Sequence, residues 1–151
     1  MEIVVNEWLL HYLCPDAQES DRMTAVRFVN ILVRKCDKMV IKRNSPFVVK
    51  FYRFMKQFES DTSSKQRFSK LNRLLFLDSD RTIIADESEL KELPKEIADK
   101  TPPDDKYLIE LWYAKQDRIV LTTDTKLKDK LKDIPGLKIC LLQEFLEEYL
   151  V

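Results

Sequence analysis

Five short apolar runs, separated by longer amphipathic segments, constrain the fold more than any other feature of this chain. Short apolar strands that alternate with helices are typical of a parallel sheet whose two faces are both covered by helices. A chain of 151 residues suits one domain of this kind. We therefore predict a three-layer α/β/α sandwich over 1–151, with a central, mostly parallel sheet of four to five strands. The expected strands are 2–5, 39–41, 81–85, 118–122 and 137–141.

Helices are expected where apolar residues recur at helical spacing and where capping residues precede them. Ser20 is expected to cap a long helix, and Asn44 or Ser45, followed by Pro46, to begin another. We expect a polar linker over 60–64 and short helical turns over 87–100, which Pro94 interrupts. The expected helices are 6–13 (after a turn), 21–36, 46–58, 65–77, one beginning at Asp104, 125–131 and 142–150.

Composition excludes several classes of function. The single glycine, Gly136, rules out the glycine-rich loops that bring backbone close to a nucleotide phosphate. The single histidine, His11, cannot by itself form a histidine-rich zinc site. Apolar runs fall far short of the ~20 residues that span a membrane. The first ten residues include Glu2 and Glu7 and no basic stretch, unlike a secretory signal. We expect a cytoplasmic protein without membrane contact.

Charge is unevenly distributed although the net charge is zero. Residues 21–75 contain 14 Lys and Arg against 4 Asp and Glu, a balance of +10, and the remainder therefore carries −10. Such asymmetry indicates a basic face for a polyanion, with RNA as the expected partner. The alternative is a pair of solvated charged faces. The proposed RNA-binding residues near the second strand are Lys42, Arg43, Arg53 and Lys56.

The helix expected over 65–77 continues this basic region. Lys65, Arg67, Lys70 and Arg73 lie on it, and Tyr52, Phe54 and Phe68 interleave with the basic side chains. Basic residues can follow a phosphate backbone while aromatic rings stack on bases. In the alternative interpretation, Tyr52 and Phe68 belong to the core and the lysines are merely solvated.

Three aspartates fall where a parallel α/β fold brings ligands together. Asp104 and Asp105 open a helix, and Asp124 follows an apolar strand. Helix starts and strand ends can meet at one edge of such a sheet. Two carboxylates ~4 Å apart repel by roughly 4 kcal/mol at an effective dielectric near 20, and a Mg²⁺ or Mn²⁺ ion relieves that repulsion. Alternatively, Asp104 and Asp124 simply cap helices and Asp105 is a favourable first-turn charge.

Three stretches resemble the PIN domain family. DDKYLIELWYAKQDRIVLTTDTKL resembles the family's aspartate-rich helix start, the following strand and its terminal Thr-x-Asp; EIVVNEWLL and MVIKRNSPFVVKFYRF resemble its first two strands with their following segments. PIN domains are small α/β/α nucleases, many of them ribonucleases and toxin components of toxin–antitoxin pairs. The resemblance covers most of the chain, and its specific motifs lie near the C-terminus.

The resemblance implies a metal site. Asp104, Asp105 and Asp124 would be catalytic residues that ligate Mg²⁺ or Mn²⁺. Asn6 occupies the position of the family's first aspartate and would orient a metal-bound water. Glu7 lies beside it.

The residues around this site match the family in one respect and depart from it in another. Thr122 and Thr123 match the family's polar position before the last acid and would support the ligands. The helix after the second strand, where the family has a glutamate, contains no acid and carries Lys50 instead. Lys50 would bring a positive charge toward the metal position and pair with Asp104 or Asp124.

Two hypotheses follow. The first is a PIN-like, metal-dependent ribonuclease acting on single-stranded RNA, either a toxin component or a weakened descendant. The second is a catalytically inactive PIN-like module that binds RNA or a protein partner. An antitoxin-like protein or a second copy of the chain would dock on the apolar stripe of the last helix, unless that stripe is core. The stripe consists of Leu142, Phe145, Leu146 and Tyr149.

Overall fold

The computed structural model, which describes residues 1–149, has a five-stranded parallel sheet at its centre, in the order β3-β2-β1-β4-β5. Ile3 of β1 lies opposite Met39 of β2 on one side and Ile119 of β4 on the other. The predicted fold class is confirmed, and each expected strand is present to within one residue at either end. The strands are β1 (Glu2–Val5), β2 (Lys38–Lys42), β3 (Thr82–Ala85), β4 (Ile119–Thr122) and β5 (Lys138–Leu141).

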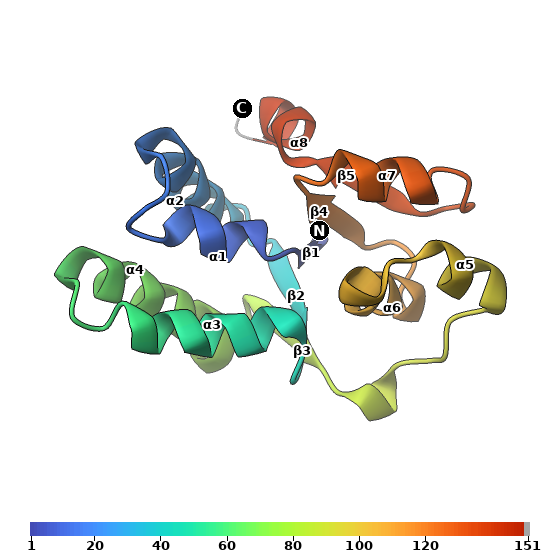
Figure 1. Cartoon of the computed structure of the whole chain (residues 1–151), viewed down its shortest axis with the longest axis horizontal. Coiled ribbons are helices and arrows are strands. Elements are labelled where there is room, and N and C mark those ends of the chain that lie inside the picture. Colours follow the sequence, from blue (N-terminus) through green and yellow to red (C-terminus); the bar gives the residue numbers. More distant parts are fainter. Residues whose placement is uncertain (150–151) are drawn as a thin grey trace.

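Helices cover both faces of the sheet. Figure 1 shows α1 to α4 on one side of the sheet and α6 on the other, where α6 packs against β1, β2 and β4. The α-helices are α1 (Trp8–Leu13), α2 (Glu19–Arg34), α3 (Pro46–Gln57), α4 (Thr62–Asn72), α5 (Lys95–Lys100), α6 (Lys106–Ala114), α7 (Thr125–Leu131) and α8 (Leu142–Tyr149). A π-helical turn, η1 (Arg73–Leu77), extends α4, and 3₁₀ turns form at η2 (Glu87–Glu89) and η3 (Pro103–Asp105).

Capping explains where two helices begin. Ser45 caps α3 as predicted, since its side chain accepts from the backbone N–H of Val48. Two other expectations are wrong. Ser20 is not a cap, because α2 already begins at Glu19. The expected linker over 60–64 is instead the start of α4, because the Asp61 carboxylate accepts from the Ser64 N–H at 3.1 Å and caps the helix earlier.

One further helix start differs from expectation, and one predicted helix end is not described. A 3₁₀ turn over Pro103–Asp105 precedes α6, so that Asp104 does not open the α-helix itself and Asp105 makes no side-chain capping bond. Leu150, at the end of the predicted last helix, lies outside the described residues, as does Val151 of the predicted domain.

The apolar stripe of α8 belongs to the core of the chain. Leu142, Leu146 and Tyr149 are buried, and Phe145 packs against the same core. These four side chains therefore do not form the docking surface considered from the sequence. Binding to a protein partner or to a second copy of the chain stays a prediction, and this stripe does not provide a surface for it. Within 1–149 no helix is long and apolar enough to cross a membrane.

The connections change direction between β1 and β4, and we use the name crevice for the region beyond the carboxyl ends of these two strands. From β1 the chain proceeds to β2 and β3 on one side of the sheet, and then crosses to β4 and β5 on the other. In open parallel sheets, ligands bind at the carboxyl ends of the strands where this change of direction occurs. Asn6 follows β1 directly, and Thr123 and Asp124 follow β4. The sheet therefore brings the predicted site residues at these two strand ends to one edge.

Candidate functional site

Asn6 joins three elements at this edge of the sheet. Its side-chain Nδ2 donates to the hydroxyl Oγ1 of Thr122, 3.0 Å away at the end of β4. Its Oδ1 accepts from the backbone N–H of Glu7 at 2.6 Å and from the hydroxyl of Tyr107, on α6, at 3.4 Å. These contacts fix which way the amide faces. Asn6 is therefore a fixed polar group at the switch point between β1 and β4.

Thr122 and Asp124 organise the end of β4. The hydroxyl of Thr122, which is fully buried, also accepts from the backbone N–H of Asp124 at 3.1 Å. The Asp124 Oδ1 accepts from the N–H groups of Lys126 and Leu127 and caps α7. The capping role predicted as the alternative for Asp124 is confirmed. Thr123, by contrast, is exposed and makes no side-chain hydrogen bond within residues 1–149.

Negative charge gathers around Asp105. Burial raises the pKa of the Asp105 carboxyl, and the charges of Asp124, Asp104 and Glu7 raise it further, while Lys130 opposes the shift. These carboxylates are therefore near enough to influence one another's charge. Across the described chain, none of the three aspartates forms an ion pair. Their repulsion is thus not relieved by a neighbouring lysine or arginine in contact.

The donor chemistry of this crevice suits a hard divalent cation. Mg²⁺ and Mn²⁺ prefer oxygen ligands such as carboxylates, and the pKa of Asp105 is raised by burial and then by the charges of the other carboxylates. Among residues 1–149, no three His, Cys, Asp or Glu side chains stand close enough to hold one ion together as they are placed. The carboxylates influence one another over a longer range than ligation requires. The crevice is therefore acidic and offers oxygen donors that suit a divalent cation, but its three aspartates do not lie close enough together to share one ion.

Lys50 has a different partner from the one that the sequence suggested. Its Nζ donates to Glu7 Oε2 at 2.8 Å and lies 3.1 Å from the Nε2 of His11. Both partners lie in the turn and helix after β1, whereas the sequence predicted that Lys50 pairs with Asp104 or Asp124. The pairing explains why Glu7, half-buried beside Asn6, is not free to act as a ligand in this arrangement. Burial and the Lys50 charge lower the pKa of His11.

Tyr107 is a site residue that sequence reasoning missed. It lies one turn after Asp104 on the apolar face of α6, where an aromatic residue normally indicates core packing. Burial, with the charges of Glu7 and Asp105, raises the pKa of its hydroxyl, so the group stays protonated and donates to Asn6. The one available signal was its place in the first turn after the paired aspartates.

The residues predicted to bind RNA near β2 differ in how free they are. Lys42 Nζ pairs with Glu87 at 2.5 Å and with the buried Glu110 at 3.3 Å. Arg43 Nε pairs with Asp86 Oδ1 at 2.6 Å. These two charges are already neutralised within the chain.

Arg53 and Lys56 are exposed on α3, and neither forms an ion pair within the described residues. The Arg53 guanidinium lies over the ring of Phe54. Of the four predicted residues, these two are therefore available to a polyanion.

Comparisons with known proteins provide no identification: no family model, no curated protein and no solved structure matches this chain.

Proposed function

We propose that this chain is a PIN-like, Mg²⁺- or Mn²⁺-dependent endoribonuclease that acts on single-stranded RNA. The observation that carries the proposal is the placement of Asp124 at the end of β4, where Thr122 joins its backbone to Asn6, with Asp105 near enough to be influenced by its charge and by that of Asp104. Unrelieved negative charge at this edge of a parallel sheet favours a divalent cation. The PIN-like order of the chain's elements and aspartates supports the choice of reaction.

Each residue of the crevice has a place in this proposal. Asp104, Asp105 and Asp124 would hold the metal ion, which supplies positive charge to a phosphate and lowers the pKa of a bound water. Thr122 holds both Asn6 and the backbone of Asp124 in position. Asn6, fixed also by the Tyr107 hydroxyl, presents a neutral amide where it can orient a water molecule. A role as the toxin component of a toxin–antitoxin pair rests on the family resemblance alone.

A second candidate function is a non-catalytic PIN-like module that binds RNA or a protein. The ion pair between Lys50 Nζ and Glu7 Oε2, at 2.8 Å, favours it, because the chain's own ammonium group then provides part of the positive charge at the crevice. The neutral Asn6 at the end of β1 favours it as well. The two candidates make opposite predictions about metal-dependent cleavage.

Cleavage of a doubly labelled single-stranded RNA under single-turnover conditions tests the proposal. The reaction is run with Mg²⁺, with Mn²⁺ and with EDTA, using the wild type and Asp124→Asn. This substitution removes the carboxylate charge but keeps a good helix cap, because Asn and Asp cap helices about equally well. Asp129→Asn, at an exposed position of the same helix, is the matched control.

The proposal expects cleavage that requires metal, that Asp124→Asn loses and that Asp129→Asn retains. RNA that stays intact with both metals, or cleavage unchanged in Asp124→Asn, would contradict it. Intact RNA together with retained RNA binding would favour the non-catalytic module.

A further inference from the structure

Exposed basic side chains without an acidic partner lie on α3, α4 and the start of η1 in the part of the chain that the structure describes. Lys56, Lys65, Lys70 and Arg73 are all exposed, and none forms an ion pair within residues 1–149. Lys42, Arg43 and other basic residues of the chain do have such partners. Arg53 on α3 and Arg27 and Arg34 on α2 are likewise exposed and unpaired within these residues, so Lys56, Lys65, Lys70 and Arg73 carry part of the positive charge of residues 21–75 that is available to a ligand.

Two adjoining hollows connect these side chains. Lys65, Lys70 and Arg73 line one of them, whose other lining residues are also polar. Tyr52, Lys56 and Lys65 line the second. Lys65 and Ser69 line both, so the two hollows form one surface, which we call the α3–α4 surface. It comprises Tyr52, Lys56, Glu59, Lys65, Ser69, Lys70 and Arg73.

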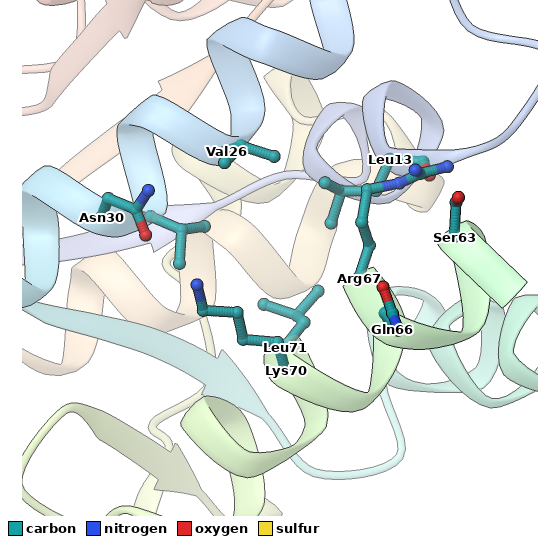
Figure 2. A pocket seen from close by; sticks show the side chains of 9 residues that line it. Leu13, Val26, Asn30, Ser63, Gln66, Arg67, Lys70 and Leu71 are labelled. Carbon is teal, nitrogen blue, oxygen red and sulfur yellow. The ribbon is translucent and has the colours of Figure 1, made fainter.

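Lys70 lies where this surface meets α2. Figure 2 shows its side chain extending from α4 toward Asn30 of α2, with Gln66 and Arg67 along the same helix. Arg67 is occupied elsewhere, because its Nε donates to the carbonyl oxygen of Leu13 and its Nη2 to Ser64. The ammonium group of Lys70 thus extends over an open hollow and has no carboxylate in contact among the described residues.

Tyr52 provides an aromatic ring beside the basic side chains. Its side chain is 53% exposed, although the ring stacks on Phe76 with centroids 5.6 Å apart and an interplanar angle of 20°. The edge contact with Phe51, which is fully buried, further fixes the ring. A ring supported on one face and more than half exposed can stack with a nucleobase at little cost in side-chain entropy.

We propose that the α3–α4 surface binds single-stranded RNA, with phosphates on Lys65, Lys70 and Arg73 and a base stacked on Tyr52. The choice of RNA rests on the proposed function; the charge and the exposed ring stand independently of it. An amphipathic helix from a protein would need an apolar floor, which a neighbouring hollow beside Lys70 and Arg73 has in Val29, Val33, Leu74 and Leu77. The hollow that the α3–α4 surface includes is lined instead by polar and charged residues, which favours RNA. Positive charge with an adjacent stacking ring is the combination that single-strand binding requires.

Glu59 is the unfavourable element of this surface. It lines both hollows and is the only carboxylate among their lining residues. A phosphate that binds beside Lys65 would be repelled by it. Glu59→Gln therefore should tighten RNA binding, whereas the same change would weaken binding of a basic peptide.

Fluorescence anisotropy with a labelled oligouridylate of about 16 nucleotides, near the upper end of common single-strand site sizes, tests the proposal. The titrations contain EDTA, so that neither metal nor cleavage contributes. Lys65→Gln/Lys70→Gln/Arg73→Gln is compared with Lys91→Gln/Lys95→Gln/Lys132→Gln, which removes three exposed charges elsewhere. Tyr52→Leu, with Tyr52→Phe as its control, tests stacking. All these positions are exposed, so folding should be retained.

We expect the first triple variant to bind RNA at least about tenfold more weakly. The slope of log K against log[salt] should become shallower by roughly two, since each phosphate contact contributes about 0.7 to it for single strands. Tyr52→Leu should bind RNA at least about fivefold more weakly than the wild type, whereas Tyr52→Phe should bind with the wild-type affinity. Equal losses in the two triple variants would overturn the proposal, because charge alone would then decide binding. So would the absence of salt-dependent binding by the wild type.

The same titrations separate this proposal from the proposed function. Asp129→Asn, the control of the cleavage experiment, should bind RNA as the wild type does, because Asp129 lies outside the α3–α4 surface. Failure of metal-dependent cleavage, with the triple-variant effect on binding intact, rejects the nuclease and supports the RNA surface. Cleavage that proceeds while both triple variants bind equally well supports the nuclease and rejects the surface.

Discussion

The side-chain amide of Asn6 donates to the hydroxyl of Thr122 at 3.0 Å, joining the ends of β1 and β4 across 116 positions of sequence. The same hydroxyl accepts from the backbone N–H of Asp124. One buried side chain therefore sets the positions of a residue on each side of the crevice. This arrangement makes the crevice part of the fold rather than a feature of mobile loops.

Thr122→Val tests this role, because valine has nearly the same shape and lacks the hydroxyl. We expect a loss of about 1–2 kcal/mol in the free energy of unfolding, since the Asn6 amide and the Asp124 N–H both lose an acceptor. Urea denaturation measures the change. Thr122→Ser keeps the hydroxyl and should recover most of the lost stability relative to valine. Equal stability of the valine variant and the wild type would show that the hydroxyl positions neither group.

The acidic crevice should make stability depend on pH. The pKa of Asp105 is raised by burial and then by Asp124, Asp104 and Glu7, so the folded protein holds this proton more tightly than the unfolded chain does. Stability therefore falls as pH rises through the folded pKa, and ionised Asp105 is unfavourable at neutral pH. Asp105→Asn should raise Tm near neutral pH.

That gain should disappear as the pH falls below the unfolded pKa, about 3.9, because Asp105 is then protonated in both states of the wild type. Thermal unfolding of both proteins at neutral and acidic pH measures it, with Asp129→Asn as an exposed control. A lower Tm for Asp105→Asn at neutral pH would mean that Asp105 makes a net favourable contribution.

Lys50 should control the titration of the only histidine in the chain. Burial lowers the pKa of His11, and the charge of Lys50, whose Nζ lies 3.1 Å from His11 Nε2, lowers it further. Lys50→Gln removes that charge, so the pKa of His11 should rise. Proton NMR titration follows this one imidazole without ambiguity. Arg53→Gln removes a weaker influence and should raise the pKa less. An unchanged pKa in Lys50→Gln would contradict the contact.

Lys42 should be a stability residue rather than an RNA contact. Its partner Glu110 is only 7% exposed, so Lys42→Met leaves a buried carboxylate without its cation. We expect a loss of about 3 kcal/mol, and recovery of most of it in Lys42→Met/Glu110→Leu, where neither charge remains. Urea denaturation of the wild type and the two variants measures these changes in the free energy of unfolding. A single variant as stable as the wild type would show that the pair is dispensable.

The edge of the sheet could be predicted from the sequence because strand ends are local features. Asn6 follows an apolar run, as do Thr122 and Asp124, and the carboxyl ends of parallel strands share one edge. The alternation of strands and helices supplied the rest of the fold class. Ser45, with Pro46 after it, correctly marked the start of α3, because that signal lies within a few consecutive residues.

Contacts between distant elements could not be predicted in the same way. Lys50 pairs with Glu7 and His11, rather than with Asp104 or Asp124, because the packing of α3 against α1 decides which carboxylate it reaches. The Tyr107 contact with Asn6 depends likewise on how α6 lies across the sheet. Neither contact can be predicted from the spacing of residues along the chain.

We expect the crevice carboxylates to bind a divalent cation, and the Mn²⁺ dependence of Tm measures this binding without any need for RNA. At about 100 times the dissociation constant, an ion that binds only the folded protein stabilises it by about 2.7 kcal/mol, or roughly 5–10 °C for a chain of this size. The wild type should show this increase. Asp105→Asn/Asp124→Asn should not, whereas Asp129→Asn/Asp133→Asn should behave as the wild type. No increase in the wild type, or an equal increase in the Asp105→Asn/Asp124→Asn protein, would contradict the claim.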